Sequence, residues 1–433
     1  MKRLVYNDLL SWKSKPNRKP LLIKGARQVG KTWLMKEFGK NEYKSVAYIN
    51  FEKATQLTDL FKQDFDTSRI LRSVQLVTGI LPIPGETLII FDELQSVPRG
   101  LLSLKYFYED VPEYHIVAAG SLLGLSTHHD DSFPVGKVDF LELCPLSFEE
   151  FLIATGNESL HKTVQSQEWK LIKAFRNNYI ELLKHYYYIG GMPEVVSSFI
   201  QSNNYTFARE IQSAILESYI NDFSKHPPLD IVPRIKMVWD AIPSQLAKEN
   251  RKFIYGAIKS GGRAKEFELA IMWLEEAGLI HKVNRITNAS LPLKGFADIN
   301  AFKLFAVDIG LLGAKSGLDA KSIIQGNQIF GQYKGALTEQ FVLQQLKFSN
   351  NIETYYWSSE KGIAEVDFVI QAKGKVIPIE VKAEENLKSK SLKSYRDKFH
   401  PEFSLRTSMS DFRIEETLTN IPLYTIFLIN KII

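Results

Sequence analysis

Near the beginning of this chain, an apolar run leads into a glycine-rich loop and then into a helical pattern. The run covers 20–24, and helical character continues from Trp33 to Gly39, which we expect to cap the helix. The loop has the form G-x-x-x-x-G-K-T and consists of Gly25, Ala26, Arg27, Gln28, Val29, Gly30, Lys31 and Thr32. A strand, such a loop and a helix in this order are typical of a phosphate-binding loop.

The chemistry of phosphate binding accounts for the residue types in this loop. Glycines allow successive backbone N–H groups to surround a phosphate, and the helix N-terminus adds the positive end of its dipole. We expect Lys31 to reach the β- and γ-phosphate oxygens and Thr32 to offer its hydroxyl to Mg²⁺. The loop therefore predicts ATP and Mg²⁺ as cofactors.

A second apolar run, 87–91, ends in Asp92 and Glu93. Two acids at the carboxyl end of a buried strand are typical of a Walker B strand, in which Asp92 orders the Mg²⁺ shell and Glu93 polarises the attacking water. Ser121 follows another apolar run at 114–119. It is expected either to read the γ-phosphate between the two motifs or to cap a helix, and both readings stay open.

Composition and length set wider bounds. A chain of 433 residues is expected to form about two to four domains. The formal charge of +5, from 54 basic and 49 acidic residues, neither requires nor excludes nucleic acid. The single cysteine, Cys144, excludes an internal disulfide and is expected to be a core thiol. The apolar run at 421–429 is about half the length needed to cross a bilayer, so we expect a cytoplasmic protein with no membrane partner.

The first part of the chain predicts an α/β nucleotide-binding domain. Short apolar runs alternate with helical stretches, which favours a parallel sheet covered on both faces. The expected strands are 20–24, 45–51, 87–91, 114–119 and 138–143. Beyond this sheet, three consecutive tyrosines, Tyr186, Tyr187 and Tyr188, point in different directions around a helix, so packing is favoured over a base-stacking platform.

A helix-turn-helix pattern follows at 253–277. We expect helices at 253–259 and 264–277 with a turn between them, and then a strand from Leu279, as in a winged helix. The second helix has an apolar face of Phe267, Ala270, Ile271, Leu274 and Ala277. It also carries four glutamates, which would repel phosphates, at Glu266, Glu268, Glu275 and Glu276. DNA contact and packing against the nucleotide-binding domain both stay open.

The last part of the chain holds a second group of acids. A helix at 335–346 carries Glu339, and strands are expected at 354–357, 364–370 and 376–382. Asp367 lies on the second strand, and Glu380 and Lys382 share one face of the third. This order is typical of restriction-endonuclease-like domains. Asp367 and Glu380 are expected to hold a divalent metal ion, Lys382 to position or deprotonate a water, and Glu339 to be an additional acid.

Four segments carry a resemblance to a known family. They are G-A-R-Q-V-G-K-T at 25–32, I-F-D-E-L-Q at 90–95, A-G-S at 119–121 and F-L-E-L-C-P-L-S-F-E-E-F at 140–151. Over nearly its whole length the chain resembles a widespread prokaryotic family with an AAA-type ATPase domain, a helical lid and a conserved region of uncharacterised function. Members often have Gly-Arg where this chain has Gly136-Lys137, so Lys137, Arg27 and Arg99 are all candidates for a charge at the transition state.

Together these features predict a multidomain α/β fold. The expected parts are a P-loop AAA-type ATPase domain at 1–155, a helical lid at 156–230, a winged-helix-like domain at 231–325 and a restriction-endonuclease-like domain at 326–433. We expect an ATP-binding and ATP-hydrolysing switch that couples nucleotide state to a nucleic-acid-binding or nuclease-like domain. The alternatives are a regulatory or DNA-binding scaffold that does not cleave, and a nuclease regulated by ATP. DNA or RNA, a protein partner and a homo-oligomer are the candidate partners.

Overall fold

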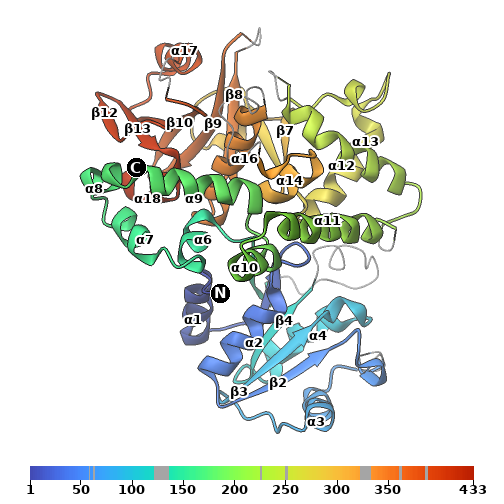
Figure 1. Ribbon diagram of the computed structural model, residues 1–433. Coiled ribbons are helices and arrows are strands. Elements are labelled where there is room, and N and C mark those ends of the chain that lie inside the picture. Colours follow the sequence, from blue (N-terminus) through green and yellow to red (C-terminus); the bar gives the residue numbers. More distant parts are fainter. Residues whose placement is uncertain are drawn as a thin grey trace.

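The computed structural model describes residues 1–57, 59–61, 64–120, 136–224, 227–248, 252–321, 333–359, 363–385 and 389–433. It shows a multidomain α/β protein with a five-stranded parallel sheet, a helical region and a C-terminal mixed sheet (Figure 1). Within the described residues, no helix combines the length and apolar character that a membrane span requires.

The N-terminal sheet is parallel throughout, as predicted, and its strand order is β2-β3-β4-β1-β5. Its strands are β1 (Leu21–Lys24), β2 (Ser45–Asn50), β3 (Thr87–Asp92), β4 (His115–Ala119) and β5 (Asp139–Glu142). Strand β4 therefore separates the strand that leads into the P-loop from the strand that ends in acids. Because parallel strands end at one edge of the sheet, both motifs reach the same edge.

Apolar side chains cover both faces of this sheet. Ile23 and Ile90 pack with Phe38 on one face, while Ile89 packs with Phe107 on the other. The covering elements are α1 (Tyr6–Ser14), α2 (Lys31–Glu42), η1 (Thr55–Leu57), α3 (Thr67–Thr78), η2 (Leu94–Ser96) and α4 (Gly100–Asp110). Burial on both faces explains why the inner strands β1, β3 and β4 are continuous apolar runs, whereas the edge strands β2 and β5 are only partly buried.

Gly39 does not cap α2, contrary to the prediction. The helix continues to Glu42 and is followed by Tyr43 in extended conformation. A Cβ atom on Gly39 would lie 2.7 Å from Cγ2 of Val46 and 3.2 Å from Cδ2 of Leu88. The glycine is therefore needed because the helix approaches the sheet closely at this point, not because the chain turns.

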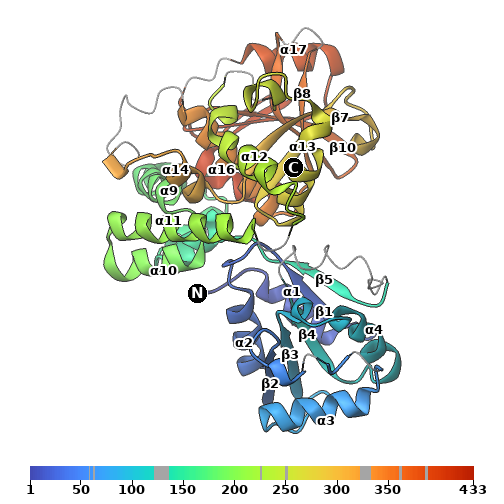
Figure 2. The same cartoon turned by 90° about the vertical axis from the view of Figure 1, so that its right-hand side faces the viewer.

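A helical region lies between the two sheets in both views (Figures 1 and 2). It comprises α6 (Phe148–Ala154), α7 (Glu158–Gln165), α8 (Trp169–Ala174), α9 (Arg176–Ile189), α10 (Pro193–Ser202) and α11 (Tyr205–Asp222). Tyr186, Tyr187 and Tyr188 at the end of α9 are all buried. The prediction that these tyrosines serve packing is confirmed.

The prediction of a helix at 253–259 is wrong. Only a 3-10 turn, η3 (Tyr255–Ala257), forms there, and α12 (Val232–Leu246) packs against α13 (Ala264–Glu276) instead. The backbone of Ile254 bonds in both directions to the side-chain amide of Gln245, at 2.9 and 3.1 Å, and Phe253 N donates to Phe302 O at 2.8 Å. These bonds occupy groups that a helix would need. The apolar face expected for α13 is buried, as predicted.

The C-terminal sheet has eight strands in the order β12-β13-β11-β10-β9-β8-β6-β7. They are β6 (Ile280–Ile286), β7 (Ala297–Ala306), β8 (Thr354–Ser358), β9 (Glu365–Ala372), β10 (Lys375–Val381), β11 (Ser404–Ser408), β12 (Arg413–Glu415) and β13 (Leu418–Pro422). The accompanying helices are η4 (Leu293–Phe296), α14 (Ile309–Lys315), α16 (Tyr333–Phe348), α17 (Lys390–Phe399), η5 (Leu423–Leu428) and α18 (Ile429–Ile432). The three strands expected around Asp367 and Glu380 are confirmed.

Strands β6 and β7 belong to this same sheet. Strand β6 runs parallel to β8, with Arg285 opposite Tyr356 and Ile286 opposite Trp357. The sheet therefore spans the expected domain limit at 325/326, and the strands that follow α13 are built into the C-terminal sheet.

Candidate functional site

Two glycines shape the loop between β1 and α2. Gly25 has a φ of +154°, and a Cβ atom there would lie 2.2 Å from the backbone oxygen of Leu143. Gly30 has a φ of +94° and immediately precedes the first residue of α2. Both positions exclude an ordinary side chain without strain, one by close approach and one by backbone conformation. The chain can therefore curl tightly at the helix N-terminus.

Lys31 lies inside this loop and is buried. Its Nζ donates to the backbone oxygens of Gly25 and Ala26, both at 2.9 Å. Burial lowers the pKa of Lys31 to about 8, and the nearby carboxylates of Glu93 and Asp92 act in the opposite direction. The ammonium group is thus held in the loop by neutral acceptors that a phosphate can replace.

The loop and the acid strand are joined by Thr32. Its Oγ1 donates to Oδ2 of Asp92 at 2.8 Å, and the same carboxylate oxygen accepts a bond of 2.9 Å from the hydroxyl of Tyr48 on β2. Burial and the adjacent Asp92 raise the pKa of Tyr48 to about 12, so this hydroxyl remains a donor at neutral pH. Sequence reasoning missed Tyr48, which no motif marks.

Glu93 lies where the chain turns out of β3, and its φ of +54° is in the left-handed region. Its Oε2 accepts a hydrogen bond of 2.6 Å from the side-chain amide of Gln95. Burial raises the pKa of the Glu93 carboxyl, with a smaller contribution from Asp92. The group is thus more basic than an exposed glutamate while it is fixed in direction by Gln95.

The P-loop also contacts helix α11. Nη1 of Arg27 lies 2.5 Å from Oδ1 of Asp222, the Tyr219 hydroxyl donates to the backbone oxygen of Arg27 at 3.0 Å, and Gln28 reaches Oγ of Ser218 at 3.4 Å. The three partners are separated from the loop by about half of the chain. Sequence reasoning did not predict these contacts because nothing local to either segment signals them.

The remaining residues predicted for this site lie elsewhere or are not described. Ser121 falls outside the described residues. Nζ of Lys137 pairs with Glu109 at 2.9 Å. The guanidinium of Arg99 lies over the ring of Phe65, 4.4 Å from its centroid. Of the three cations considered for the transition state, Arg27 is the one that belongs to the P-loop itself.

A second polar site is formed by β9 and β10. The last pair in this ladder is Phe368 opposite Ile379, so Asp367 and Glu380 occupy the next position on adjacent strands. Oδ2 of Asp367 accepts from Val381 N at 2.8 Å, and Nζ of Lys382 lies 2.7 Å from Oε1 of Glu380. Burial and the neighbouring Asp367 raise the pKa of Glu380 to about 7, against the opposing effect of Lys382. The structure brings these three predicted residues together.

Glu339, the additional acid expected with Asp367 and Glu380, pairs with a buried lysine. It is buried on α16, and its Oε2 lies 3.6 Å from Nζ of Lys303, which also pairs with Oε1 of Glu365 at 2.5 Å. Lys303 is a fully buried lysine on β7 that sequence reasoning missed, although a lone lysine in the apolar run 301–307 was a signal. Within the described ranges, no group of three or more His, Cys, Asp or Glu residues is arranged to hold a metal ion.

Three family models match the chain. Residues 17–152 match an AAA domain, residues 180–322 match a domain of unknown function, DUF8612, and residues 334–426 match another, DUF4143. The chain therefore contains an AAA-type P-loop ATPase domain followed by two domains of unknown function. The AAA domain implies ATP binding.

Among solved structures, a Walker-type ATPase of Pyrococcus abyssi is 14% identical, with 72% of this chain and 95% of that chain covered and a TM-score of 0.45. The Aeropyrum pernix ORC1 protein in complex with DNA is 10% identical, with 72% and 90% covered and a TM-score of 0.27. Because both TM-scores are below 0.5, neither likeness supports a functional inference. A search of curated proteins found no match to the sequence.

Proposed function

We propose that this protein is an ATP-hydrolysing switch in which the nucleotide state of the P-loop is transmitted to the helical region and the C-terminal sheet. The observation that carries the proposal is the meeting of three elements at one site. The P-loop is joined to the acid strand by the Thr32–Asp92 bond and to α11 by the Arg27–Asp222 ion pair. A nucleotide bound there contacts the hydrolytic residues and also lies next to the contact between the P-loop and α11.

The residues at the edge of the sheet fit a magnesium nucleotide. Mg²⁺ is usually held by one or two carboxylates together with phosphate oxygens. The Thr32 hydroxyl and the Asp92 carboxylate are hydrogen-bonded to each other, so both are available at one place. Thr32 and Asp92 would hold the ion, which would supply positive charge to neutralise the charge that develops on the phosphate. Lys31 exchanges its backbone acceptors for phosphate oxygens. Glu93, with its raised pKa, orients a water and takes its proton.

The route from the loop to the C-terminal sheet runs through the start of α10. Pro193 lies beside the P-loop, because a Cβ atom on Gly30 would be 3.6 Å from its Cγ. Gly191, two residues earlier, donates its N–H to Oδ2 of Asp308 at 2.6 Å. Asp308 follows β7 and caps α14 through a 3.0 Å bond from Leu311 N. A movement of α10 therefore acts directly on the end of a strand in the C-terminal sheet.

Hydrogen exchange tests this coupling in the full chain with ATP, with ADP and without nucleotide. We expect nucleotide to change the exchange of α11 and α14, and Asp222→Asn to reduce that change without abolishing ATP binding. Asp64→Asn is the matched control, because Asp64 pairs with Arg69 of α3 at 2.5 Å, and α3 lies far from α11 and α14 (Figure 1). Equal exchange in all nucleotide states would refute the switch.

The C-terminal acids favour a second candidate function, a metal-dependent nuclease. The element order α16, β8, β9, β10, α17 and β11, with β10 antiparallel to β9 and parallel to β11, supports the restriction-endonuclease-like reading. Asp367 contributes to the raised pKa of Glu380, and a cation between the two carboxylates would relieve this repulsion. Asp367 and Glu380 would hold Mg²⁺ or Mn²⁺, which neutralises charge on a phosphodiester, while Lys382 orients a water.

Incubating the full chain with DNA or RNA and Mg²⁺ or Mn²⁺, with and without ATP, tests this candidate function. Metal-dependent strand cutting that disappears in Asp367→Asn supports it. Binding of nucleic acid without cutting under every condition would leave the non-cleaving scaffold instead.

A further inference from the structure

A row of polar side chains crosses one face of the C-terminal sheet, beginning at the Asp367 and Glu380 positions. Glu380 on β10 is opposite Arg406 on β11, and Arg406 is opposite Asn420 on β13. Asn420 is in turn opposite Arg413 on the edge strand β12. Residues opposite each other in a ladder project from the same face, and strands are about 4.8 Å apart. Arg406 therefore lies about 5 Å from Glu380 along this row, and Arg413 about 14 Å.

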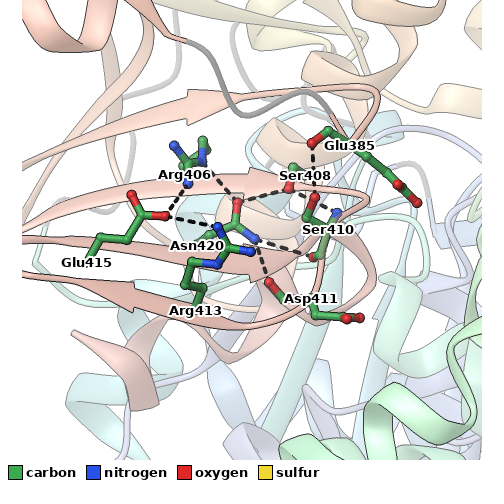
Figure 3. Close-up of polar contacts among 8 residues, drawn as sticks. All are labelled: Glu385, Arg406, Ser408, Ser410, Asp411, Arg413, Glu415 and Asn420. Carbon is green, nitrogen blue, oxygen red and sulfur yellow. Dashed lines mark hydrogen bonds and ion pairs between the residues drawn. The ribbon is translucent and has the colours of Figure 1, made fainter.

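Two guanidinium groups of the row meet at one carboxylate (Figure 3). Nη2 of Arg406 lies 3.3 Å from Oε1 of Glu415, and Nη1 of Arg413 lies 3.6 Å from the same oxygen. The Arg406 side chain is only 5% exposed, whereas those of Arg413 and Glu415 are 61% and 43% exposed. The cluster thus has a buried arginine and an exposed arginine that share one carboxylate, so these three side chains carry a net positive charge.

Asn420 fixes the direction of the buried arginine. Its Oδ1 accepts from Nε of Arg406 at 3.1 Å and from Oγ of Ser408 at 2.9 Å. Its Nδ2 donates to the backbone oxygens of Ser410 and Asp411 at 3.3 and 2.9 Å. Such a network preorganises a guanidinium, which reduces the entropy cost of binding an anion.

We infer that Arg406 and Arg413 form a subsite for the phosphodiester backbone of a nucleic acid, and that Glu415 occupies the phosphate position in the free protein. The inference rests on the nucleic-acid partner proposed above. Guanidinium groups bind phosphate in bidentate fashion, and a phosphate offers more acceptor oxygens than the single carboxylate oxygen that both arginines now share. A backbone that passes Glu380 and Lys382 reaches this pair further along the same row.

A neighbouring cavity extends the basic track. It has a volume of about 590 Å³ and lies between α17 and the start of β13. Its lining includes Lys393, Arg396, His400 and Thr417, together with Asp397 and Glu402. Thr417 lies between Glu415 and Leu418, which face each other across the β12–β13 hairpin. Basic side chains thus continue beyond the arginine pair. The ion pair between the exposed side chains of Arg413 and Glu415 contributes little to the stability of the fold by itself.

Two exposed substitutions with opposite expected effects test the subsite. Binding of a fluorescein-labelled DNA duplex, and of the RNA duplex of the same sequence, is followed by anisotropy in EDTA without ATP, so that cutting and hydrolysis do not contribute. Arg413→Gln is expected to weaken binding about five- to tenfold and to lower the salt slope by about 0.9. Glu415→Gln is expected to tighten binding about three- to fivefold, because a competing anion is lost.

Matched controls separate local from general charge effects. Arg72→Gln on α3 removes an exposed arginine far from the row (Figure 1). Glu86→Gln removes a carboxylate of the N-terminal domain that is 41% exposed and pairs with Lys44, which matches the exposure of Glu415. The inference is overturned if nucleic acid binds but the test variants equal their controls, and the proposed nucleic-acid partner then stands. If neither duplex binds the unaltered protein, the nucleic-acid partner and the subsite fall together. Preference for one duplex identifies the backbone as DNA or RNA.

Discussion

Replacing Lys31 with methionine should strengthen the nucleotide-free fold while weakening the binding of ATP. The pKa of Lys31 falls from 10.5 to about 8 on burial. At 1.36 kcal/mol per unit, keeping the lysine charged at pH 7 costs the fold about 3 kcal/mol. The two bonds to Gly25 and Ala26 return about 1 kcal/mol each. The net gain expected for Lys31→Met is therefore about 1 kcal/mol, or about 2 °C in melting temperature.

The sign of the pH dependence follows from the lowered pKa. The cost of the buried charge is fully present below about pH 8, and it disappears as the pH rises towards the ordinary lysine value of 10.5. The stability advantage of Lys31→Met should therefore shrink above pH 8. Lys40→Ala, an exposed change on the same helix, should show no such trend.

The loss of ATP affinity can be estimated from the same contacts. Two charge-assisted bonds to phosphate contribute about 3 to 6 kcal/mol, from which about 2 kcal/mol is subtracted for the backbone bonds that Lys31 gives up. The remainder, about 1 to 4 kcal/mol, corresponds to a loss of about five- to a thousandfold in affinity. Thermal unfolding at several pH values and titration with a fluorescent ATP analogue measure the two effects. Unchanged ATP affinity would refute the site, and a lower melting temperature at pH 7 would refute the buried-charge argument.

Three further outcomes are expected. Glu93→Gln should keep ATP binding and reduce phosphate release at least a hundredfold, because the amide cannot accept the proton of water; near-normal release would exclude Glu93 as the base. Asp222→Asn should weaken nucleotide-dependent protection of α11, since it removes the carboxylate that holds Arg27, and an unchanged exchange pattern would refute that role. In nucleotide-free protein, millimolar Mg²⁺ or Mn²⁺ should raise the melting temperature by mass action, Asp367→Ala should erase the shift, and Lys382→Ala should retain it while losing any cleavage. Absence of a shift in the unaltered protein would argue against the metal site.

The segment from residue 326 onward is not suitable for these experiments on its own, because its sheet is incomplete. Strand β8 pairs with β6 on one side, so a chain that begins at 326 lacks two strands of its sheet. The full chain is therefore the appropriate protein, with nucleotide omitted so that the P-loop site does not contribute.

The fold of the nucleotide-binding domain and the identity of its motifs could be predicted from the sequence alone. The phosphate-binding loop, the acid strand and the five parallel strands are recognisable because each depends on a short contiguous pattern: an apolar run buried on both faces, glycines at a tight turn, or two acids at a strand end. The same reasoning placed Asp367, Glu380 and Lys382, since period-two alternation and a hairpin bring them together locally.

The contacts that join distant segments could be found only in the three-dimensional structure. Tyr48 reaches Asp92 from another strand, and Asp222 reaches Arg27 from a helix far along the chain. Lys303 on β7 pairs with both Glu339 and Glu365. Gly39 shows the same limit, because its spacing resembles a helix end while its neighbours on the sheet dictate the glycine. Contacts between side chains that are far apart in the sequence depend on packing and charge in the folded chain. A local sequence pattern therefore does not predict them.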